Sequence, residues 1–290
     1  MALHQDAAVD ARSALSHENS VPGGGDGVQR WQVEEARRLY RAERCRRPET
    51  LLSRRRPGLT VDEAYGVQWC GAGLRMGAGA RVVGHKVGLT SAAMQQQIGI
   101  GEPDFGVLLD SMIVAPDGVL WAGDLLAPRI EAEIAFRLGA DVGGAEVTDQ
   151  DVRAAVAEVF LALEVIDSRF ELAGITVADS VADNAGAARC VLGAPSSLPE
   201  WDLRDERLTV CVGTREVATG EGRDILGDPL RSVSWLARRL HVFGMGLAAG
   251  EVVLAGAVHA SLPLPVGQTV SVRSPRLPSV SLHIAPDHGD

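Results

Sequence analysis

The spacing of apolar residues divides the chain into a helical section and a longer strand-rich body. Residues 28–47 place apolar side chains at helical spacing, and Thr60 followed by Glu63 predicts the capped start of a helix over 60–75. Beyond residue 80 the period shortens to two, which is typical of strands. The clearest alternation is the segment PRIEAEIAFRL at 128–138.

Later segments add two helices and more strands. Thr148 with Asp151 predicts a helix over 149–160, and Asp228 with Pro229 predicts a helix that ends at Gly244. Extended segments with turn residues between them predict the remaining strands. The predicted segments are a strand at 81–89, a short helix at 91–99, extended chain at 105–114 and 161–167, a hairpin at 206–222, and short strands within 250–285.

These elements predict an α+β protein in which helices precede a mixed, strand-rich body. Residues 1–27 are rich in Ala, Ser, Gly and acidic residues, and we expect a disordered tail there. We therefore expect a tail at 1–27, a helical section at 28–79 and a β-rich unit at 80–290.

Charge is distributed unevenly along the 290 residues. Residues 30–56 contain ten arginines and four glutamates, which gives this segment a net charge of +6. The rest of the chain carries -16, and the two sum to the total of -10. Few aromatic residues lie between the arginines, which favours a solvated, salt-bridged helix face over an RNA-binding patch. Glu34 with Arg38 and Glu43 with Arg47 are expected pairs of this face. The acidic balance argues against nucleic acid or an anionic membrane as partner.

Several other classes of protein find no support in the sequence. No apolar run is long enough for a membrane helix, the first twenty residues do not resemble a secretory signal, and the four cysteines lack metal-type spacing. GxSxG, Walker A and GxGxxG motifs are absent. We therefore expect a cytoplasmic protein with reduced cysteines.

Two glutamates of the alternating segment are candidates for a metal site. Glu131 and Glu133 share one face of the predicted strand, about 7 Å apart, because side chains alternate and the rise is ~3.3 Å per residue. They could converge on one hard cation. The alternative is a solvent-exposed sheet face.

Glu164 lies in the apolar run FLALEVID and is expected to be buried. A buried carboxylate needs a metal or a partner charge, and Arg169 or Arg129 could supply the charge. Together with the two strand glutamates, Glu164 would make an all-oxygen site suited to Mg²⁺ or Mn²⁺.

Lys86 is the only lysine beside 27 arginines, and it lies in the middle of a predicted strand. A desolvated lysine can shift its pKa toward neutrality and move protons, whereas arginine stays protonated. A structural salt bridge or chance retention is the alternative. His85 and His259 are weaker candidates for acid–base groups.

The blocks GHKVGLTS, QQQIGIGEPDFGVLL, RIEAEIAF, LEVIDSRF and DSVADNAG resemble a known family. They are similar to the 2-keto-4-pentenoate hydratases and 4-oxalocrotonate decarboxylases of aromatic catabolism, within the fumarylacetoacetate-hydrolase-like superfamily. The resemblance covers residues 28–285. It implies a mixed β-sandwich roll preceded by helices, usually assembled as a homo-oligomer.

The resemblance also implies the roles of residues. Glu131, Glu133 and Glu164 would bind Mg²⁺ or Mn²⁺, and Lys86 would be catalytic with Asp104 in the same pocket. The matched blocks further imply substrate contacts, which are Thr90, Ser180 and Asn184. One position departs from the family, because Gly186 replaces a serine and removes a hydroxyl that could hold the substrate.

The implied reaction adds water to a 2-hydroxy-2,4-dienoate and gives a 4-hydroxy-2-oxo acid. The alternative is decarboxylation of a 2-oxo-3-enedioate, since both reactions pass through the same dienolate. A third possibility is a non-catalytic subunit that supports a partner enzyme of the same pathway, against which the intact lysine and glutamates argue.

Overall fold

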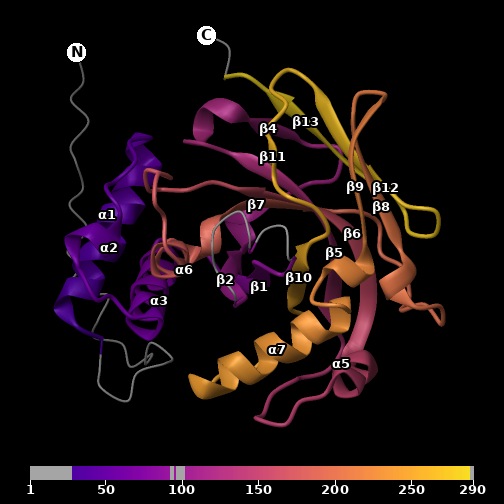
Figure 1. The fold of residues 1–290 in the computed structure, drawn as a ribbon, viewed down its shortest axis with the longest axis horizontal. Coiled ribbons are helices and arrows are strands. Elements are labelled where there is room, and N and C mark those ends of the chain that lie inside the picture. The colour runs from indigo at the N-terminus through magenta and orange to yellow at the C-terminus, as the bar shows by residue number, and fades with distance from the viewer. Residues whose placement is uncertain (1–27, 92–94, 96–101, 288–290) are drawn as a thin grey trace.

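The computed structural model describes residues 28–91, 95 and 102–287. The predicted tail at 1–27 and most of the predicted helix at 91–99 lie outside these residues. Figure 1 shows helices α1, α2, α3 and α6 grouped on one side of the molecule, with the β-sheets and the long helix α7 on the other.

Capping residues mark where the main helices begin. Thr60 accepts a hydrogen bond from the Glu63 amide at the start of α3, and Asp228 accepts one from Leu230 at the start of α7. The α-helices are α1 (Arg30–Cys45), α2 (Leu52–Arg55), α3 (Val61–Gly77), α5 (Asp149–Ala155), α6 (Val177–Ala182) and α7 (Pro229–Val242). The short 3₁₀ helices are η1 (Asp110–Met112), η2 (Ala122–Asp124), η3 (Asn184–Gly186), η4 (Leu203–Asp205) and η5 (Gly222–Asp224).

An eight-stranded mixed sheet forms the centre of the molecule. Its order is β2-β1-β10-β5-β6-β7-β3, with β11 paired to β5, and β1 runs parallel to β10 while β5 runs antiparallel to β6. Its strands are β1 (Val82–Gly88), β2 (Asp104–Leu109), β3 (Ile113–Val114), β5 (Arg129–Leu138), β6 (Val156–Ile166), β7 (Ala187–Leu192), β10 (Val252–Ala257) and β11 (Leu262–Pro263).

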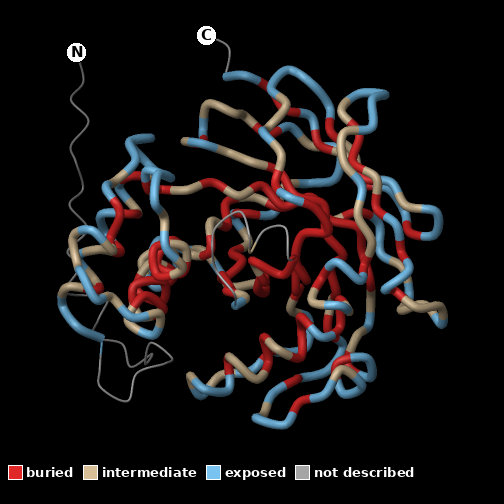
Figure 2. Tube along the Cα trace, in the orientation of Figure 1, coloured by how far each residue is buried: buried red, intermediate tan, exposed pale blue. Residues whose placement is uncertain are grey.

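A five-stranded sheet of order β4-β13-β12-β8-β9 packs against the first. Its strands are β4 (Val119–Trp121), β8 (Arg207–Val212), β9 (Arg215–Glu221), β12 (Thr269–Arg273) and β13 (Val280–Ala285). The fold is therefore the α+β mixed sandwich with preceding helices that the sequence predicts. Figure 2 shows that the buried residues follow the central strands.

Strand alternation decides which side chains face the second sheet. Ile130, Ala132 and Ile134 belong to the core shared with β8, β12 and β13. The odd-numbered residues of β5 therefore point to the opposite face of the sheet. Helices α1 and α3 contribute to the same core, and the division at residue 79/80 stays a prediction.

The predicted helix over 149–160 is too long. Helix α5 ends at Ala155, and residues 156–166 form β6, whose backbone pairs with β5 and β7. Pairing between two central strands outweighs the helical spacing, because it satisfies the backbone and buries β-branched and aromatic side chains together. The sequence analysis missed α2, α6, β4 and β7.

The arginine-rich section pairs differently from the expectation. Glu34 pairs with Arg30, not Arg38, and Glu43 pairs with Arg75 of α3, not Arg47. Glu43 thus links α1 to α3. Within the described part of the chain, none of the helices has the length and apolarity that a membrane span requires.

Candidate active site

Three glutamates converge on the sheet face that points away from the second sheet. Glu131 and Glu133 share that face of β5, and Glu164 of β6 lies directly opposite Glu131 in the antiparallel register. One carboxylate oxygen from each lies within 4.8 Å of the others, and all three side chains are buried. The alternative of a solvent-exposed sheet face is therefore wrong.

The cluster leaves buried oxygen atoms without hydrogen-bond partners among the described residues. Glu133 Oε2 accepts a hydrogen bond of 2.7 Å from the Gly256 amide, but its Oε1 and both oxygens of Glu164 accept none from the described residues. Burial, reinforced by the charges of Glu164 and Glu131, raises the pKa of Glu133 well above its usual value. Burial likewise raises the pKa of Glu131 to about 7. An arrangement of close, buried, all-oxygen donors fits a hard divalent cation such as Mg²⁺ or Mn²⁺.

Lys86 supplies the charge that faces this cluster. Its Nζ lies 3.5 Å from Glu164 Oε1, and both side chains are buried. The predicted arginine partners of Glu164 are wrong, because Arg169 pairs with Asp183 and Arg129 bonds to Ser261.

The expected shift of the Lys86 pKa toward neutrality is also wrong in this structure. Burial alone lowers that pKa, but the charges of Glu164, Asp104 and the other glutamates raise it by more, so the net direction is upward. Lys86 is therefore an ammonium group held among carboxylates.

Asp104 lies beside Lys86 because β1 and β2 pair closely. A Cβ atom at Gly88 would lie 2.2 Å from Asp104 Oδ1 and 3.2 Å from Lys86 Nζ, so glycine is required for the two groups to approach. The Ser180 hydroxyl of α6 donates a 2.7 Å hydrogen bond to Asp104 Oδ2. Burial raises the Asp104 pKa, and Lys86 and Ser180 oppose that rise.

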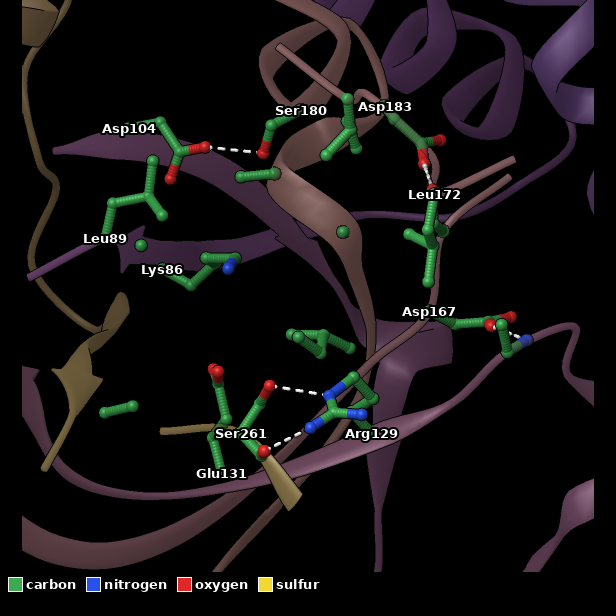
Figure 3. A pocket seen from close by; sticks show the side chains of 18 of the residues that line it. Lys86, Leu89, Asp104, Arg129, Glu131, Asp167, Leu172, Ser180, Asp183 and Ser261 are labelled. Atoms are coloured by element: carbon green, nitrogen blue, oxygen red, sulfur yellow. Dashed lines mark hydrogen bonds between the residues drawn. The ribbon is translucent and has the colours of Figure 1, made fainter. Parts of the chain in front are cut away.

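A cavity of about 370 Å³ opens onto this cluster. Lys86, Asp104 and Glu131 line it, whereas Glu133 and Glu164 are not among the lining residues. Figure 3 shows Lys86 and Asp104 on one side of the space, Leu172 on the opposite side, and Glu131 below. The apolar part of the lining includes Leu89, Ile166, Leu172 and Ile175.

Thr90 lines the cavity with a hydroxyl that has no hydrogen-bond partner among the described residues, although only 3% of the side chain is exposed. A Cβ atom at Gly256 would lie 2.1 Å from Thr90 Oγ1, so the glycine makes room for it. This placement suits the substrate contact predicted for Thr90, which stays a prediction.

Asn184 lies outside the cavity lining. Its Oδ1 accepts a 2.8 Å hydrogen bond from the Val107 amide, and its Nδ2 donates to the Val107 carbonyl. Asn184, Ala185 and Gly186 have φ values of 56°, 51° and 71°, a left-handed turn next to the site. Non-glycine residues rarely adopt this conformation, and the paired amide holds it in place.

The departure at Gly186 is a matter of backbone as well as of a missing hydroxyl. Gly186 lines the cavity, and a Cβ there would meet only Ile166 at 3.6 Å. Space is therefore available, but the positive φ would strain any other residue.

Sequence reasoning did not place a second group of residues at the cavity. It named Arg129 only as a candidate charge partner of Glu164, although the strand period puts Arg129 on the same face of β5 as Glu131. Ser261 and Asp167 also line the cavity. Asp167 accepts hydrogen bonds from the Leu126 and Ala127 amides, which only the tertiary structure shows. The capping box of Thr176 with Asp179 marks α6 and was a missed signal.

The two histidines have structural partners. His259 Nε2 accepts a hydrogen bond from the Ala132 amide, its Nδ1 contacts the Ala260 carbonyl, and burial lowers its pKa. His85 Nδ1 lies 3.6 Å from Glu251 Oε2. Neither histidine lines the cavity.

Residues 82–285 match the family model for the fumarylacetoacetate (FAA) hydrolase C-terminal domain. The chain belongs to this family. A 2-keto-4-pentenoate hydratase of Paraburkholderia xenovorans (strain LB400) is 41% identical over 228 residues, 78% of this chain and 84% of the relative. A 2-hydroxyhexa-2,4-dienoate hydratase of Comamonas testosteroni is 37% identical over 237 residues, 80% of this chain and 89% of the relative.

A solved structure is similar over most of the chain. It is a 4-oxalocrotonate decarboxylase from Pseudomonas putida G7 complexed with magnesium and adipate, with a TM-score of 0.84 and 34% identity, covering 88% of this chain and 97% of that chain. The same decarboxylase complexed with calcium and acetate gives a TM-score of 0.83. The family thus includes two reaction types among relatives of comparable similarity.

Proposed function

We propose that the protein is a hydro-lyase that adds water to a 2-hydroxy-2,4-dienoate and releases a 4-hydroxy-2-oxo acid. The observation that carries this proposal is the buried group of Lys86, Asp104 and Glu131 on the wall of one cavity. Relatives named hydratases at 37–41% identity support the reaction type.

Glu131, Glu133 and Glu164 would hold a divalent cation, Mg²⁺ or Mn²⁺, through their clustered oxygens. Similarity to a decarboxylase solved with magnesium supports this assignment. When bound, such a cation stabilises negative charge on a carboxylate and on an adjacent oxygen of the substrate, as a Lewis acid.

Lys86 and Asp104 move the protons in the proposed mechanism. Asp104 accepts the proton of the C2 hydroxyl, and the Lys86 ammonium donates a proton to C5, which converts the dienol into a 2-oxo-3-enoate. Transfer of the proton from Asp104 back to Lys86 restores both groups. Water then adds at C4, and a proton is delivered to C3, so the net change is the addition of one water molecule.

The surrounding residues would bind and orient the substrate. The Thr90 hydroxyl has no other partner among the described residues and can donate to a substrate oxygen. Ser180 orients Asp104 through its 2.7 Å hydrogen bond. The apolar wall of Leu89, Ile166 and Leu172 would contact the carbon chain of the diene.

A second candidate function is decarboxylation of a 2-oxo-3-enedioate. The similarity to a 4-oxalocrotonate decarboxylase over 88% of this chain favours it. Loss of CO₂ from such an acid leaves a dienolate, and the same lysine could protonate it.

The setting of the enzyme is part of the proposal. We expect a homo-oligomer in the cytoplasm that has no nucleic acid or membrane partner and that can associate with another enzyme of the same pathway. All four cysteines are free, which agrees with a reducing compartment.

One experiment separates the two reactions. The protein is supplied with Mg²⁺ and either 2-hydroxypenta-2,4-dienoate or 2-oxohex-3-enedioate, and ultraviolet absorbance and CO₂ release are measured. Turnover of the dienoate without CO₂ supports the hydratase. CO₂ release from the diacid with no turnover of the dienoate would overturn it.

A further inference from the structure

Gln68 of α3 connects the two chain segments that carry Asp104 and Ser180. Its Nε2 donates a 2.8 Å hydrogen bond to the Phe105 carbonyl and a 2.9 Å hydrogen bond to the Val181 carbonyl. Phe105 directly follows Asp104 in β2, and Val181 directly follows Ser180 in α6. A single side chain, only 2% exposed, therefore bonds to both segments that meet in the 2.7 Å contact between Ser180 and Asp104 (Figure 3).

Both carbonyls lie where regular secondary structure ends. Strand β2 is at the edge of the central sheet, so some of its carbonyls have no neighbouring strand to pair with. Val181 is in the last turn of α6, where a carbonyl lacks the amide four residues further on that it would have in a helix interior. Gln68 supplies an N–H donor to each carbonyl, which a side chain that only fills space could not do.

Helix α6 depends on such contacts for its position. It is six residues long, and a helix of this length is not stable by itself. At its first turn, Asp179 accepts hydrogen bonds of 2.8 Å from the Ser53 amide and 2.7 Å from the Ser53 hydroxyl. At its last turn, Gln68 donates to Val181. Helices α2 and α3 thus hold α6, which also packs against β2 (Figure 1).

The contribution of Gln68 is distinct from apolar packing between α3 and β2. Tyr65, one turn earlier in α3, already stacks on the ring of Phe105 with centroids 4.4 Å apart. Gln68 instead leaves its own Oε1 buried with no hydrogen-bond partner among the described residues. An unpaired buried acceptor is destabilising, so a residue selected only for stability would be apolar.

We propose that Gln68 is a positioning residue for proton transfer, which fixes the distance between Ser180 and Asp104 and thereby the orientation of the Asp104 carboxylate toward Lys86. This inference rests on the proposed function, in which Asp104 accepts the proton of the C2 hydroxyl. Gln68 is not among the residues that line the cavity, so it acts through the two segments and not on the substrate. Without the Ser180 hydrogen bond the carboxylate is free to rotate away from the reacting atoms.

A double-mutant cycle tests the proposal. Methionine has the length and shape of glutamine but no N–H donor. We expect Gln68→Met to lower kcat roughly 10-fold to 100-fold and to change KM by no more than about twofold, because a proton carrier is misplaced while substrate contacts stay. Ser180→Ala should give a similar loss, since it removes the same hydrogen bond to Asp104.

The double variant decides whether Gln68 acts through Ser180. In the Ser180→Ala background, Gln68→Met should lower kcat further by no more than about twofold, the usual error of such cycles. Losses that multiply in the double variant would overturn the proposal.

Gln32→Met is the matched control. Gln32 is a buried glutamine of α1 that also makes two hydrogen bonds to backbone, to the Glu63 carbonyl and from the Gln29 amide, both within the helical section. We expect Gln32→Met to leave kcat unchanged. An equal loss of kcat in this variant would show a general weakening of the helical section and would overturn the positioning role.

Gln68→Glu is a second variant with the same shape. Between two carbonyl oxygens its buried carboxyl group stays protonated, because burial disfavours the charge, and it offers one hydrogen in place of two. We expect a kcat between those of the wild type and Gln68→Met. This variant carries the test if Gln68→Met does not fold, and a kcat equal to that of the wild type would then overturn the proposal.

A crystal structure of Gln68→Met gives a readout that needs no turnover. The distance from Ser180 Oγ to Asp104 Oδ2 should exceed about 3.5 Å, the limit of a hydrogen bond. That result in a protein that turns over neither the dienoate nor the enedioate would retain the positioning role and reject the proposed function. Turnover of the dienoate by a Gln68→Met variant with wild-type kcat and an unchanged contact would do the reverse.

Discussion

The Lys86 ammonium nitrogen lies 3.5 Å from Glu164 Oε1, and 3% and 1% of the two side chains are exposed. This contact joins β1 to β6 across two intervening strands. It places the only lysine of the chain among the carboxylates that could hold a cation. Both roles proposed for the site, cation binding and proton transfer, therefore depend on one buried group of charges.

Replacement of Lys86 by arginine tests the proton-transfer role. Arg conserves the charge beside Glu164, but its guanidinium is larger and is a weaker acid than the ammonium group of lysine. We expect Lys86→Arg to lower turnover by at least ~100-fold, the size of general acid–base contributions, while Mg²⁺ binding is retained. Steady-state kinetics and calorimetry measure the two effects. Near-normal turnover would return Lys86 to a structural role.

Replacement of Glu133 by glutamine tests the cost of clustering the carboxylates. Its pKa is raised above 4.5 in the folded protein, so the folded state keeps a proton that the unfolded chain loses as pH rises. Stability of the chelator-treated wild type should therefore fall as pH rises above about 4.5 on account of this group.

Glu133→Gln should thus stabilise the chelator-treated protein by roughly 1–3 kcal/mol near pH 8, and the gain should shrink at lower pH. The same variant should lose the rise in melting temperature that Mg²⁺ gives the wild type. Urea unfolding in chelator measures the free energy of unfolding, and thermal unfolding with and without Mg²⁺ measures the melting temperature. A lower free energy of unfolding for Glu133→Gln than for the wild type in chelator would show that the buried Glu133 carboxylate does not destabilise the fold.

Mg²⁺ affinity should depend on pH through Glu131. Burial raises its pKa to about 7 in the structure, and a cation must displace that proton. Below pH 7 we expect the affinity to fall roughly tenfold per pH unit for each proton displaced. Calorimetry at pH 6, 7 and 8 in two buffers of different ionisation enthalpy counts the protons released. An affinity that does not change with pH would reject this coupling.

Asn184 should act on stability, not on substrate affinity. Asn184→Ala removes two hydrogen bonds to Val107 and leaves a residue less suited to φ 56°, so we expect a loss of about 2 kcal/mol. Asn184→Asp keeps the acceptor for the Val107 amide and should lose less. Chemical unfolding and KM are the measurements. A raised KM with unchanged stability would restore the predicted substrate contact.

Local sequence patterns were sufficient for most of the elements and for part of the site. The period of two in β5 places Glu131 and Glu133 on one face and Ile130 and Ala132 on the other, because each successive side chain of a strand points the opposite way. The capping residue Thr60 predicts the start of α3 because it satisfies free amides of the first turn. These features depend on neighbours within a few residues, so the sequence alone determines them.

Tertiary structure decided which groups meet. The register that sets Glu131 opposite Glu164, and the approach of Lys86 to both, depend on the pairing of strands far apart in the chain. The sequence could not show that Asn184 bonds to Val107 for the same reason. The two-residue period of a strand identifies the face of the sheet on which a side chain lies. Only long-range packing determines which residues lie across from that side chain, and these residues set its burial, its charge partner and its pKa.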